Sequence, residues 1–380
     1  MTKKKIVFLT GTRADFGKIK ALINKLEKSK QYEPHIFVTG MHMLSKYGST
    51  YTEVRRQNYK NIYEFINQTE STTPDIVLSN TLLGFSNYVN ELKPDLIIIH
   101  GDRIESLAAA IVGAFNNIRV AHIEGGEISG TIDESIRHAI SKFSHLHFVS
   151  NQESKNRLIQ LGEKKERIYV IGSPDIDIMK AKNLPKIYEV KKHYDITFKK
   201  YAMFIYHPVT TDIENLGKNI AEVVSALIES TKNYIVILPN NDKGSDIIVN
   251  EFNRFKSNSH FRIFPSIRFE YFLTLLKHSE FIIGNSSAGI REAEVYGIPS
   301  IDIGNRQNNR SPNKDIIKVF HEKNKIIPAI RIAANKKLSP KSYFGKGNSS
   351  IKFLRILSKL NIKKIQLQKE FYDISNHRTK

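Results

Sequence analysis

Acidic side chains follow two apolar runs of this chain, at the points where the runs end. Asp102 comes just after the run from Leu96 to Ile99, and Glu124 follows the run from Ile118 to Ile123. Asp133 lies a short distance further on. Such runs are typical of buried parallel strands, and ligands bind beyond the carboxyl ends of these strands. We therefore expect the three carboxylates to meet in one cleft, where they could perform proton transfer.

A loop suited to an anion follows the first apolar run. Residues 6–9 lead into Thr10 to Lys18, which includes Gly11 and Arg13 and continues as a helix. Free backbone N–H groups and the helix dipole favour an anion at a helix start, and a guanidinium suits phosphate. The loop matches neither common nucleotide-binding fingerprint, so a simple turn with a capping residue is the alternative interpretation.

A similar loop, from Gly284 to Ala293, follows a later apolar run. Ser286 and Ser287 add hydroxyls to its backbone donors, and Glu292 is placed to bind ribose hydroxyls. The alternative makes Ser286 a helix cap and Glu292 an ordinary charge of the first helical turn.

Further polar side chains follow other expected strands. His207 comes at a strand end beside a proline, where it could donate to a phosphate oxygen or assist a leaving group, although a structural role is also common. Asn240 lies in a polar loop after the next strand, and Arg306 follows the last one. The histidines do not form a metal-binding pattern, so we expect no metal.

Strand and helix patterns alternate along the chain, which predicts an α/β fold with mainly parallel strands. We expect two Rossmann-like halves that face each other across a cleft. The expected strands of the first half are residues 6–9, 35–38, 96–99, 120–123, 146–149 and 169–171. Those of the second half are residues 201–205, 234–238, 261–264, 281–283 and 299–303.

These patterns suggest domain boundaries. We expect an N-terminal domain with the acidic residues over 1–182 and a C-terminal nucleotide-binding domain over 183–350. Residues 351–380 are expected to form a helix that packs back toward the first domain, followed by a tail.

Composition limits the class of protein. The chain has 380 residues, 40% of them hydrophobic, which is enough for two domain cores. It has no cysteine and no apolar run near the roughly 18 residues of a membrane span, so we expect a cytoplasmic enzyme without membrane attachment. The net charge of +20 invites a nucleic-acid-binding alternative, but the lysines are dispersed along the chain. A basic surface also favours an anionic ligand.

Taken together, the motifs resemble those of the hydrolysing UDP-N-acetylglucosamine 2-epimerases of bacterial sialic acid synthesis. The resemblance runs from residue 5 to about residue 310 and then thins. The matching segments are residues 11–18, 100–103, 122–127, 133–138, 172–175, 207–210 and 284–292. Non-hydrolysing relatives carry Gly-Thr-Arg-Pro-Glu at the first loop and Glu-Ala-Gly-Leu-Arg at the acidic loop. This chain has Arg13-Ala14-Asp15 and Glu124-Gly125-Gly126-Glu127, as in the hydrolysing enzymes.

The resemblance implies a glycosyltransferase-B-like fold and a metal-independent enzyme without a tightly bound cofactor. It implies conversion of UDP-N-acetylglucosamine and water to N-acetylmannosamine and UDP, as the first step of sialic acid and capsule polysaccharide synthesis. It also implies a homodimer or homotetramer. The catalytic residues that it implies are Asp102, Glu124, Asp133 and His207. The expected substrate-binding residues are Arg13, Arg103, Asn240, Ser286, Ser287, Gly289, Glu292 and Arg306.

Several alternatives stay open at this point. The same chemistry could act on a 2,4-diacetamido-trideoxy UDP-sugar, as in legionaminic-type pathways, or the chain could be a non-hydrolysing epimerase. A retaining glycosyltransferase on the same fold is a third possibility. Fold likeness alone does not decide among them, and the acidic motifs favour the epimerase.

Overall fold

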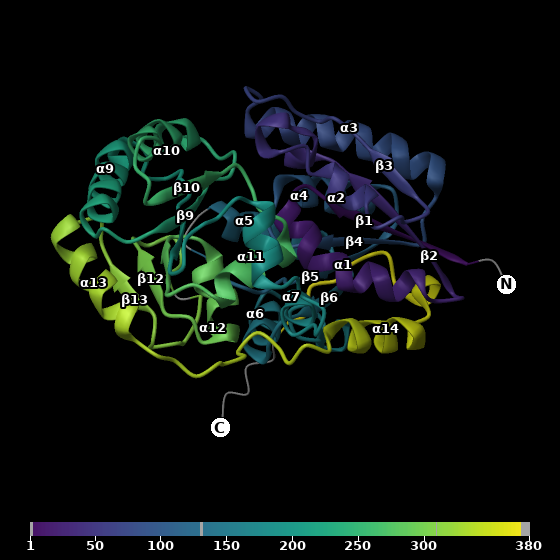
Figure 1. Cartoon of the computed structure of the whole chain (residues 1–380). Coiled ribbons are helices and arrows are strands. Elements are labelled where there is room, and N and C mark those ends of the chain that lie inside the picture. Colours follow the sequence, from purple (N-terminus) through teal and green to yellow (C-terminus); the bar gives the residue numbers. More distant parts are fainter. Residues whose placement is uncertain (1–2, 130–131, 309, 374–380) are drawn as a thin grey trace. The chain divides into compact units, whose positions relative to one another are not determined.

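The computed structural model describes residues 3–129, 132–308 and 310–373, and the chain forms two compact units. The first unit contains Met1–Glu127, Asp133–Lys180 and Phe344–Lys380. The second contains Ile128–Ile132 and Ala181–Tyr343. The chain thus leaves the first unit after Lys180 and returns to it at Phe344 (Figure 1).

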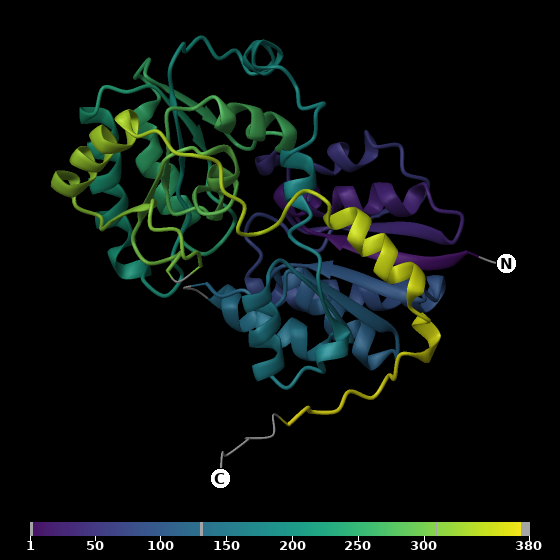
Figure 2. The ribbon, with the colours of Figure 1, turned by 90° about the horizontal axis from the view of Figure 1, so that it is seen from below.

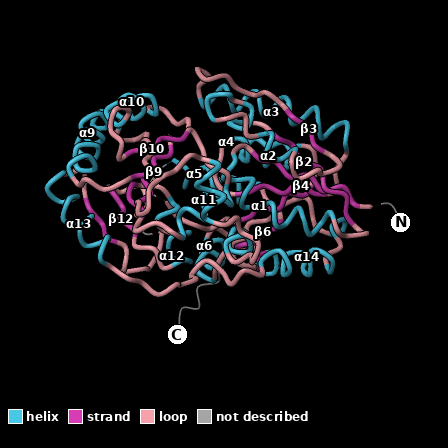
Figure 3. Tube along the Cα trace, in the orientation of Figure 1, coloured by secondary structure: helices cyan, strands magenta, loops and turns pink. Residues whose placement is uncertain are grey.

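The described part of the first unit holds a seven-stranded parallel sheet in the order β3-β2-β1-β4-β5-β6-β7. Figure 3 shows strands in magenta and helices in cyan. Its strands are β1 (Lys4–Thr10), β2 (Tyr32–Val38), β3 (Ile62–Glu64), β4 (Leu96–His100), β5 (Arg119–Ile123), β6 (Leu146–Val149) and β7 (Ile168–Val170). The central strands are mainly apolar and almost wholly buried, as is typical of parallel sheets that are covered on both faces. The order reverses between β1 and β4, which makes their carboxyl ends a topological switch point.

Helices cover both faces of this sheet. They are α1 (Arg13–Glu27), α2 (Tyr51–Arg55), α3 (Pro74–Leu92), α4 (Ile104–Phe115), α5 (Ile132–Phe143), α6 (Gln152–Gln160), α7 (Asp175–Met179) and α14 (Ser349–Lys359). Helices α1 and α14 share one buried cluster with alternate residues of β1, and α3 and α4 share another with the remaining ones. Figure 2 shows α14 lying along α1, so the returning C-terminal segment completes one layer of the first unit.

The described part of the second unit repeats the plan with a six-stranded parallel sheet in the order β10-β9-β8-β11-β12-β13. Its strands are β8 (Ala202–Ile205), β9 (Tyr234–Ile237), β10 (Phe261–Phe264), β11 (Ile282–Gly284), β12 (Ser300–Ile303) and β13 (Ile317–Val319). Its helices are α8 (Ile187–His193), α9 (Ile213–Glu229), α10 (Ser245–Glu251), α11 (Phe269–Lys277), α12 (Glu292–Tyr296) and α13 (Lys323–Asn335). Apolar residues of α9 and α13 pack on this sheet, whose order reverses between β8 and β11.

The α/β class with parallel strands is therefore confirmed. The expected strands are present with ends shifted by a few residues, and β3 and β13 are additional edge strands that the sequence pattern did not indicate. Across the described ranges, no helix has the length and hydrophobicity that a membrane crossing requires.

Candidate active site

The switch point of the first unit gathers side chains from three strand ends. His100 is the last residue of β4, Asp15 lies in the first turn of α1 directly after β1, and Glu124 follows β5. The backbone N–H of Gly101 donates to the carbonyl of Ile123 at 3.0 Å, which ties the loops after β4 and β5 together.

The imidazole of His100 bridges two carboxylates. Its Nδ1 lies 2.8 Å from Oδ1 of Asp15, and its Nε2 lies 3.1 Å from Oε2 of Glu124. Burial alone would lower the pKa of His100, but the charge of Glu124 and the hydrogen bonds to both carboxylates outweigh it and raise the pKa to about 9. The two carboxylates therefore favour the protonated form of the ring.

Glu124 is also fixed from its other side. The hydroxyl of Ser173, which follows β7, donates to Oε1 of Glu124. The backbone N–H of Glu124 donates to the carbonyl of Phe148 at 2.9 Å. Glu124 has a φ of 65°, in the left-handed region that glycine favours. Its side chain is buried in the first unit and held in a defined orientation.

Asp102 has a different cation. Its carboxylate forms an ion pair with the guanidinium of Arg137, which is 1% exposed. Nη1 of Arg137 also donates to the carbonyl of Glu127 at 3.1 Å, and Oε1 of Glu127 accepts a 2.8 Å hydrogen bond from Ser150. Arg137 thus links the loop after β4 to the acidic loop after β5.

Asp133 lies one helical turn before Arg137 on α5, so the two side chains share a face of that helix. Because α5 begins at Ile132, Asp133 lies within the first turn and is not the residue that caps it. The preceding residues 130 and 131 of the acidic loop lie outside the described residues.

A neutral histidine supports the same loops. Nε2 of His122 lies 2.8 Å from the carbonyl oxygen of Gly101, and Nδ1 lies 3.0 Å from the Ser141 hydroxyl. Burial lowers the pKa of His122 to about 3. The ring is uncharged, donates from Nε2 to Gly101 and accepts at Nδ1 from Ser141.

The two arginines expected at the phosphates of the substrate both lie near carboxylates of the first unit. Arg13 begins α1, with Nη2 3.7 Å from Glu53, and the Thr12 side chain caps this helix by accepting from the N–H of Asp15. Arg103 follows Asp102, and its Nε lies 3.4 Å from the buried Glu105. Thr12 is therefore a helix cap, as the alternative interpretation of the first loop expected. Anion binding at this loop stays a prediction.

At the switch point of the second unit, Asn285 joins the loops after β8 and β11. Its Oδ1 accepts from the N–H of His207 at 2.7 Å, and its Nδ2 donates to the carbonyl of His207 at 2.8 Å. The carbonyl of Asn285 in turn accepts from Arg306 at 3.3 Å and from Gln307 at 3.0 Å. His207 and Arg306 are therefore brought to one place by a residue whose role the sequence did not indicate.

His207 also contacts the loop after β9. Its Nδ1 accepts from the backbone N–H of Asn240 at 3.1 Å, which places the proton of a neutral ring on Nε2. The side chain of Asn240 donates to Asp242. Three successive strand ends of the second unit are connected in this way.

The serine loop packs tightly against the same sheet. Gly284 has a φ of 134°, and a Cβ there would lie 1.9 Å from the carbonyl oxygen of Ile205, so only glycine fits. Ser286 caps the short helical turn Ser287–Gly289, as the alternative interpretation held, by accepting from the N–H of Ala288. Glu292, the first residue of α12, is buried.

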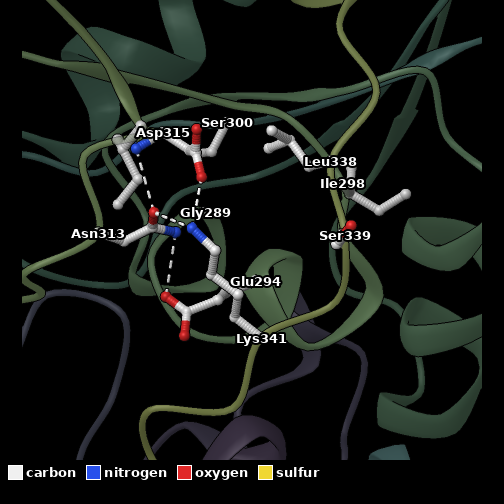
Figure 4. A pocket seen from close by; sticks show the side chains of 11 residues that line it. Gly289, Glu294, Ile298, Ser300, Asn313, Asp315, Leu338, Ser339 and Lys341 are labelled. Carbon is white, nitrogen blue, oxygen red and sulfur yellow. Dashed lines mark hydrogen bonds and ion pairs between the residues drawn. The ribbon is translucent and has the colours of Figure 1, made fainter.

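A small cavity lies behind this loop (Figure 4). It encloses about 10 Å³, room for one water rather than a sugar. Glu294 accepts from Asn313 at 3.1 Å, and Lys341 donates to Asp315 at 2.5 Å. A Cβ on Gly289 would lie 2.6 Å from the Ser300 hydroxyl, which gives Gly289 a packing role at the cavity wall.

The predicted residues thus divide between the units. Asp102, Glu124, Asp133, Arg13 and Arg103 belong to the first, and His207, Asn240, Ser286, Ser287, Gly289, Glu292 and Arg306 belong to the second. The sequence did not predict the contacts of five further residues: Asp15, His100, Ser173, Arg137 and Asn285. Most of them follow or end a strand, which is the same feature that identified the predicted site residues.

Comparison with known proteins places this chain in a family. The family model described as UDP-N-acetylglucosamine 2-epimerase matches residues 24–358. A UDP-N-acetylglucosamine 2-epimerase from Neisseria meningitidis serogroup B is 46% identical, with 98% of this chain and 100% of the relative covered. A UDP-N,N'-diacetylbacillosamine 2-epimerase (hydrolyzing) from Legionella pneumophila is 34% identical, with 93% and 95% covered. A polysialic acid biosynthesis protein P7 from Escherichia coli is 34% identical, with 98% of each covered.

Solved structures agree with the sequence relatives. The Methanocaldococcus jannaschii UDP-GlcNAc 2-epimerase in complex with UDP-GlcNAc and UDP matches with a TM-score of 0.79 at 25% identity, covering 93% of this chain and 99% of that one. A glycosyltransferase from Glycyrrhiza uralensis, UGT73P12, matches with a TM-score of 0.58 at 12% identity, covering 97% of each chain, which supports the likeness of the fold alone. The chain belongs to the UDP-N-acetylglucosamine 2-epimerase family.

Proposed function

We propose that this protein is a hydrolysing 2-epimerase, which converts UDP-N-acetylglucosamine and water to N-acetylmannosamine and UDP. The observation that carries the proposal is the Glu124 carboxylate, which is buried at the carboxyl end of the sheet, lies 3.1 Å from Nε2 of His100 and accepts a hydrogen bond from Ser173. A base that is held charged and oriented before the substrate arrives suits the removal of a weakly acidic sugar proton.

The proposed reaction begins with loss of UDP. The C2 proton is not next to a carbonyl, so departure of the diphosphate leads and positive charge develops at C1. The C1–O bonding pair leaves with UDP, the C2–H pair becomes the C1=C2 double bond of 2-acetamidoglucal, and a carboxylate takes the proton. Water then adds at C1 while C2 receives a proton on the opposite face, which inverts that centre.

The residues divide into two roles under this proposal. Asp102, Glu124 and Asp133 handle the protons. The leaving diphosphate is stabilised by donors, and removal of one such donor typically costs about 10²–10³ in rate. These donors are Arg13, Arg103, His207, Ser286 and Ser287. Glu292 binds the ribose, with Asn240, Gly289 and Arg306 beside the nucleotide.

Two observations support the hydrolysing reaction. The Legionella pneumophila relative carries the word hydrolyzing in its name, as does a Campylobacter jejuni relative that is 34% identical over 83% of this chain. The loops with Arg13-Ala14-Asp15 and Glu124-Gly125-Gly126-Glu127 differ from the non-hydrolysing pattern. The Escherichia coli relative supports a role in sialic acid synthesis.

The same two hydrolyzing relatives favour a second candidate substrate, a UDP-sugar with acetamido groups at C2 and C4. Turnover of a panel of UDP- and GDP-sugars, followed by NMR of the released sugar, separates the candidates. Free N-acetylmannosamine with UDP supports the proposal, and intact UDP-N-acetylmannosamine contradicts hydrolysis.

The proton-handling roles predict the effect of single amide substitutions. Asp102→Asn, Glu124→Gln and Asp133→Asn should each lower the rate of N-acetylmannosamine release by about 100-fold or more, since an amide accepts no proton. Asp75→Asn is the control, because Asp75 lies in the first turn of α3 as Asp133 does in α5, but is exposed. Release at the wild-type rate by all three active-site variants would contradict the assignment.

A further inference from the structure

A buried carboxylate that the proposed reaction does not use lies against the loop after β1. Glu105, in the first turn of α4, is 0% exposed, and Nε of Arg103 lies 3.4 Å from its Oε2. We propose that Glu105 is a positioning residue, which holds Arg103 by Nε so that the two terminal nitrogens of the guanidinium bind the leaving diphosphate. This proposal rests on the proposed function, in which Arg103 is one of the diphosphate donors.

The first argument is the surroundings of the Glu105 carboxylate. Both of its oxygens are buried, and neither accepts a hydrogen bond from the described residues. Among those residues, the cation within ion-pair distance is that of Arg103. A buried carboxylate without donors is costly, so proteins normally pair such a group or replace it. The ion pair with Arg103 is therefore the principal polar contact of Glu105.

The second argument is the space that two glycines leave for this carboxylate. A Cβ on Gly40, shortly after β2, would lie 2.5 Å from Oε1 of Glu105. A Cβ on Gly11, directly after β1, would lie 3.1 Å from the carboxyl carbon. Two strand ends are thus shaped around Glu105. A buried ion pair is weak evidence for stability, since well-packed apolar side chains often stabilise a fold as well or better. The retained pair therefore points to a role in the site.

The simpler interpretation makes Glu105 an ordinary acidic residue at a helix start. A carboxylate in the first turn does interact favourably with the helix dipole. Asp75, in the first turn of α3, has this position while it is exposed to solvent. The dipole therefore does not explain why Glu105 is buried against two glycines and beside Arg103.

The third argument is the placement of Arg103. It lies at the carboxyl end of β4, three residues after His100, and precedes α4. Its Nε is buried, whereas the side chain as a whole is 22% exposed, so the exposed part lies elsewhere on the side chain. A guanidinium held by one edge presents its other nitrogens in a fixed orientation, which suits bidentate binding of phosphate. Such preorganisation lowers the entropy lost on binding.

The test is a double-mutant cycle for UDP affinity, measured by isothermal titration. Glu105→Gln keeps the size of the side chain and removes its charge, so it should weaken UDP binding about tenfold while Arg103 is present. In the Arg103→Gln background, the same substitution should change UDP affinity by less than about twofold. Losses of equal size in the two backgrounds would show a merely structural role, and tighter binding by Glu105→Gln would show that Glu105 repels the anion. Either result would overturn the proposal.

Glu163→Gln is a matched control. Glu163 is also a buried carboxylate of the first unit, but its ion pairs with lysines are with Lys142 and Lys369. Its substitution should lower stability and leave UDP affinity within about twofold of wild type. A tenfold loss of UDP affinity in Glu163→Gln would show that any buried charge has this effect, and the role of Glu105 would be refuted.

A second variant covers a Glu105→Gln protein that fails to fold. Arg103→Lys keeps the positive charge but lacks the fork, so its single nitrogen cannot contact Glu105 and also bind phosphate with two further donors. It should weaken UDP binding about tenfold, and unchanged affinity would contradict the proposal. Failure of the proposed function is distinguishable from this outcome, because the products of the wild-type protein decide whether hydrolysis occurs, whereas the cycle compares UDP affinities alone.

Discussion

Two buried carboxyl groups differ in whether neighbouring donors and charges offset the effect of burial. Glu124 lies 3.1 Å from Nε2 of His100 and accepts a hydrogen bond from the Ser173 hydroxyl. Asp302, on β12 of the second unit, is 2% exposed, and the charges of Lys318 and Arg306 only partly oppose its desolvation. Burial raises the pKa of Asp302 to about 6. A carboxyl without strong donors is thus driven toward its neutral form.

This difference predicts a pH-dependent gain in stability from Asp302→Asn. The pKa of Asp302 is higher in the folded protein than the ordinary 3.8, so ionisation at high pH opposes folding. The substitution should raise the free energy of unfolding at pH 8 by about 1–3 kcal/mol and have little effect near pH 4. Urea denaturation at both pH values measures this.

Asp246→Asn, at an exposed position of α10 in the same unit, is the control and should stay within about 0.5 kcal/mol of wild type. An equal effect of Asp302→Asn at both pH values would show that the gain comes from something other than desolvation of the charge.

The positions of the acidic residues were predictable, and their partners were not. Asp102 and Glu124 follow long apolar runs, so their place at strand ends follows from the sequence alone. The contact of His100 with Asp15 joins β4 to α1, and that of Asp102 with Arg137 joins the loop after β4 to α5. Such pairings depend on strand order and helix rotation, which hydrophobic periodicity does not specify.

Among the elements, the loops of the second unit depend on one amide. Asn285 binds both backbone groups of His207, and its own carbonyl accepts from Arg306 and Gln307. Since three of these four residues come from loops after β8 and β12, one side chain fixes the relative position of several strand ends. The proposed phosphate donors His207 and Arg306 share that support.

Asn285→Ala should therefore weaken UDP binding about tenfold, because the donors lose a common anchor and ordering them costs free energy on binding. Isothermal titration with UDP measures the change. Asn233→Ala provides the comparison: Asn233 donates to the carbonyl of Lys200 just before β9, at the opposite end of the same sheet. UDP affinity that is equal in the two variants would argue against Asn285 as the anchor.

Two strands that we did not expect, β3 and β13, show where hydrophobic patterns fail to identify a strand. β3 and β13 are three-residue edge strands, and neither is buried. Each mixes apolar and charged residues, so neither produces the continuous apolar run that identified the central strands. The inner strands, buried on both faces, were found because burial on both faces demands such runs.

Over the whole molecule, the end of the chain is part of the first unit rather than an appendage. After α14, residues 361–373 form a C-terminal strap on that unit. Arg119 donates to the carbonyls of Lys363 and Ile365, and Tyr372 donates from its backbone to Gly162. Nζ of Lys369 lies 2.7 Å from Oε2 of Glu163, and Nε2 of His147 lies 3.0 Å from the same oxygen. Nζ of Lys142 lies 3.2 Å from Oε1 of Glu163. The strap thus supplies a cation to a buried carboxylate.

Lys369→Met should destabilise the first unit. Burial would raise the pKa of Glu163, but the hydrogen bond to His147 and the charge of Lys369 outweigh it and lower the pKa to about 2. A depressed carboxyl pKa stabilises the fold above the ordinary value of 4.5, and this contribution disappears as the pH falls toward 2. We expect the variant to lose about 1–3 kcal/mol at pH 7, with a deficit that shrinks below pH 4.5. Lys359→Met is the control. Lys359 is the exposed last residue of α14, so its substitution removes one positive charge without removing the contact with Glu163, and its stability should match that of the wild type.

Thermal unfolding of both variants across this pH range measures the difference. If the C-terminal strap does not stabilise the first unit, the two variants will unfold alike.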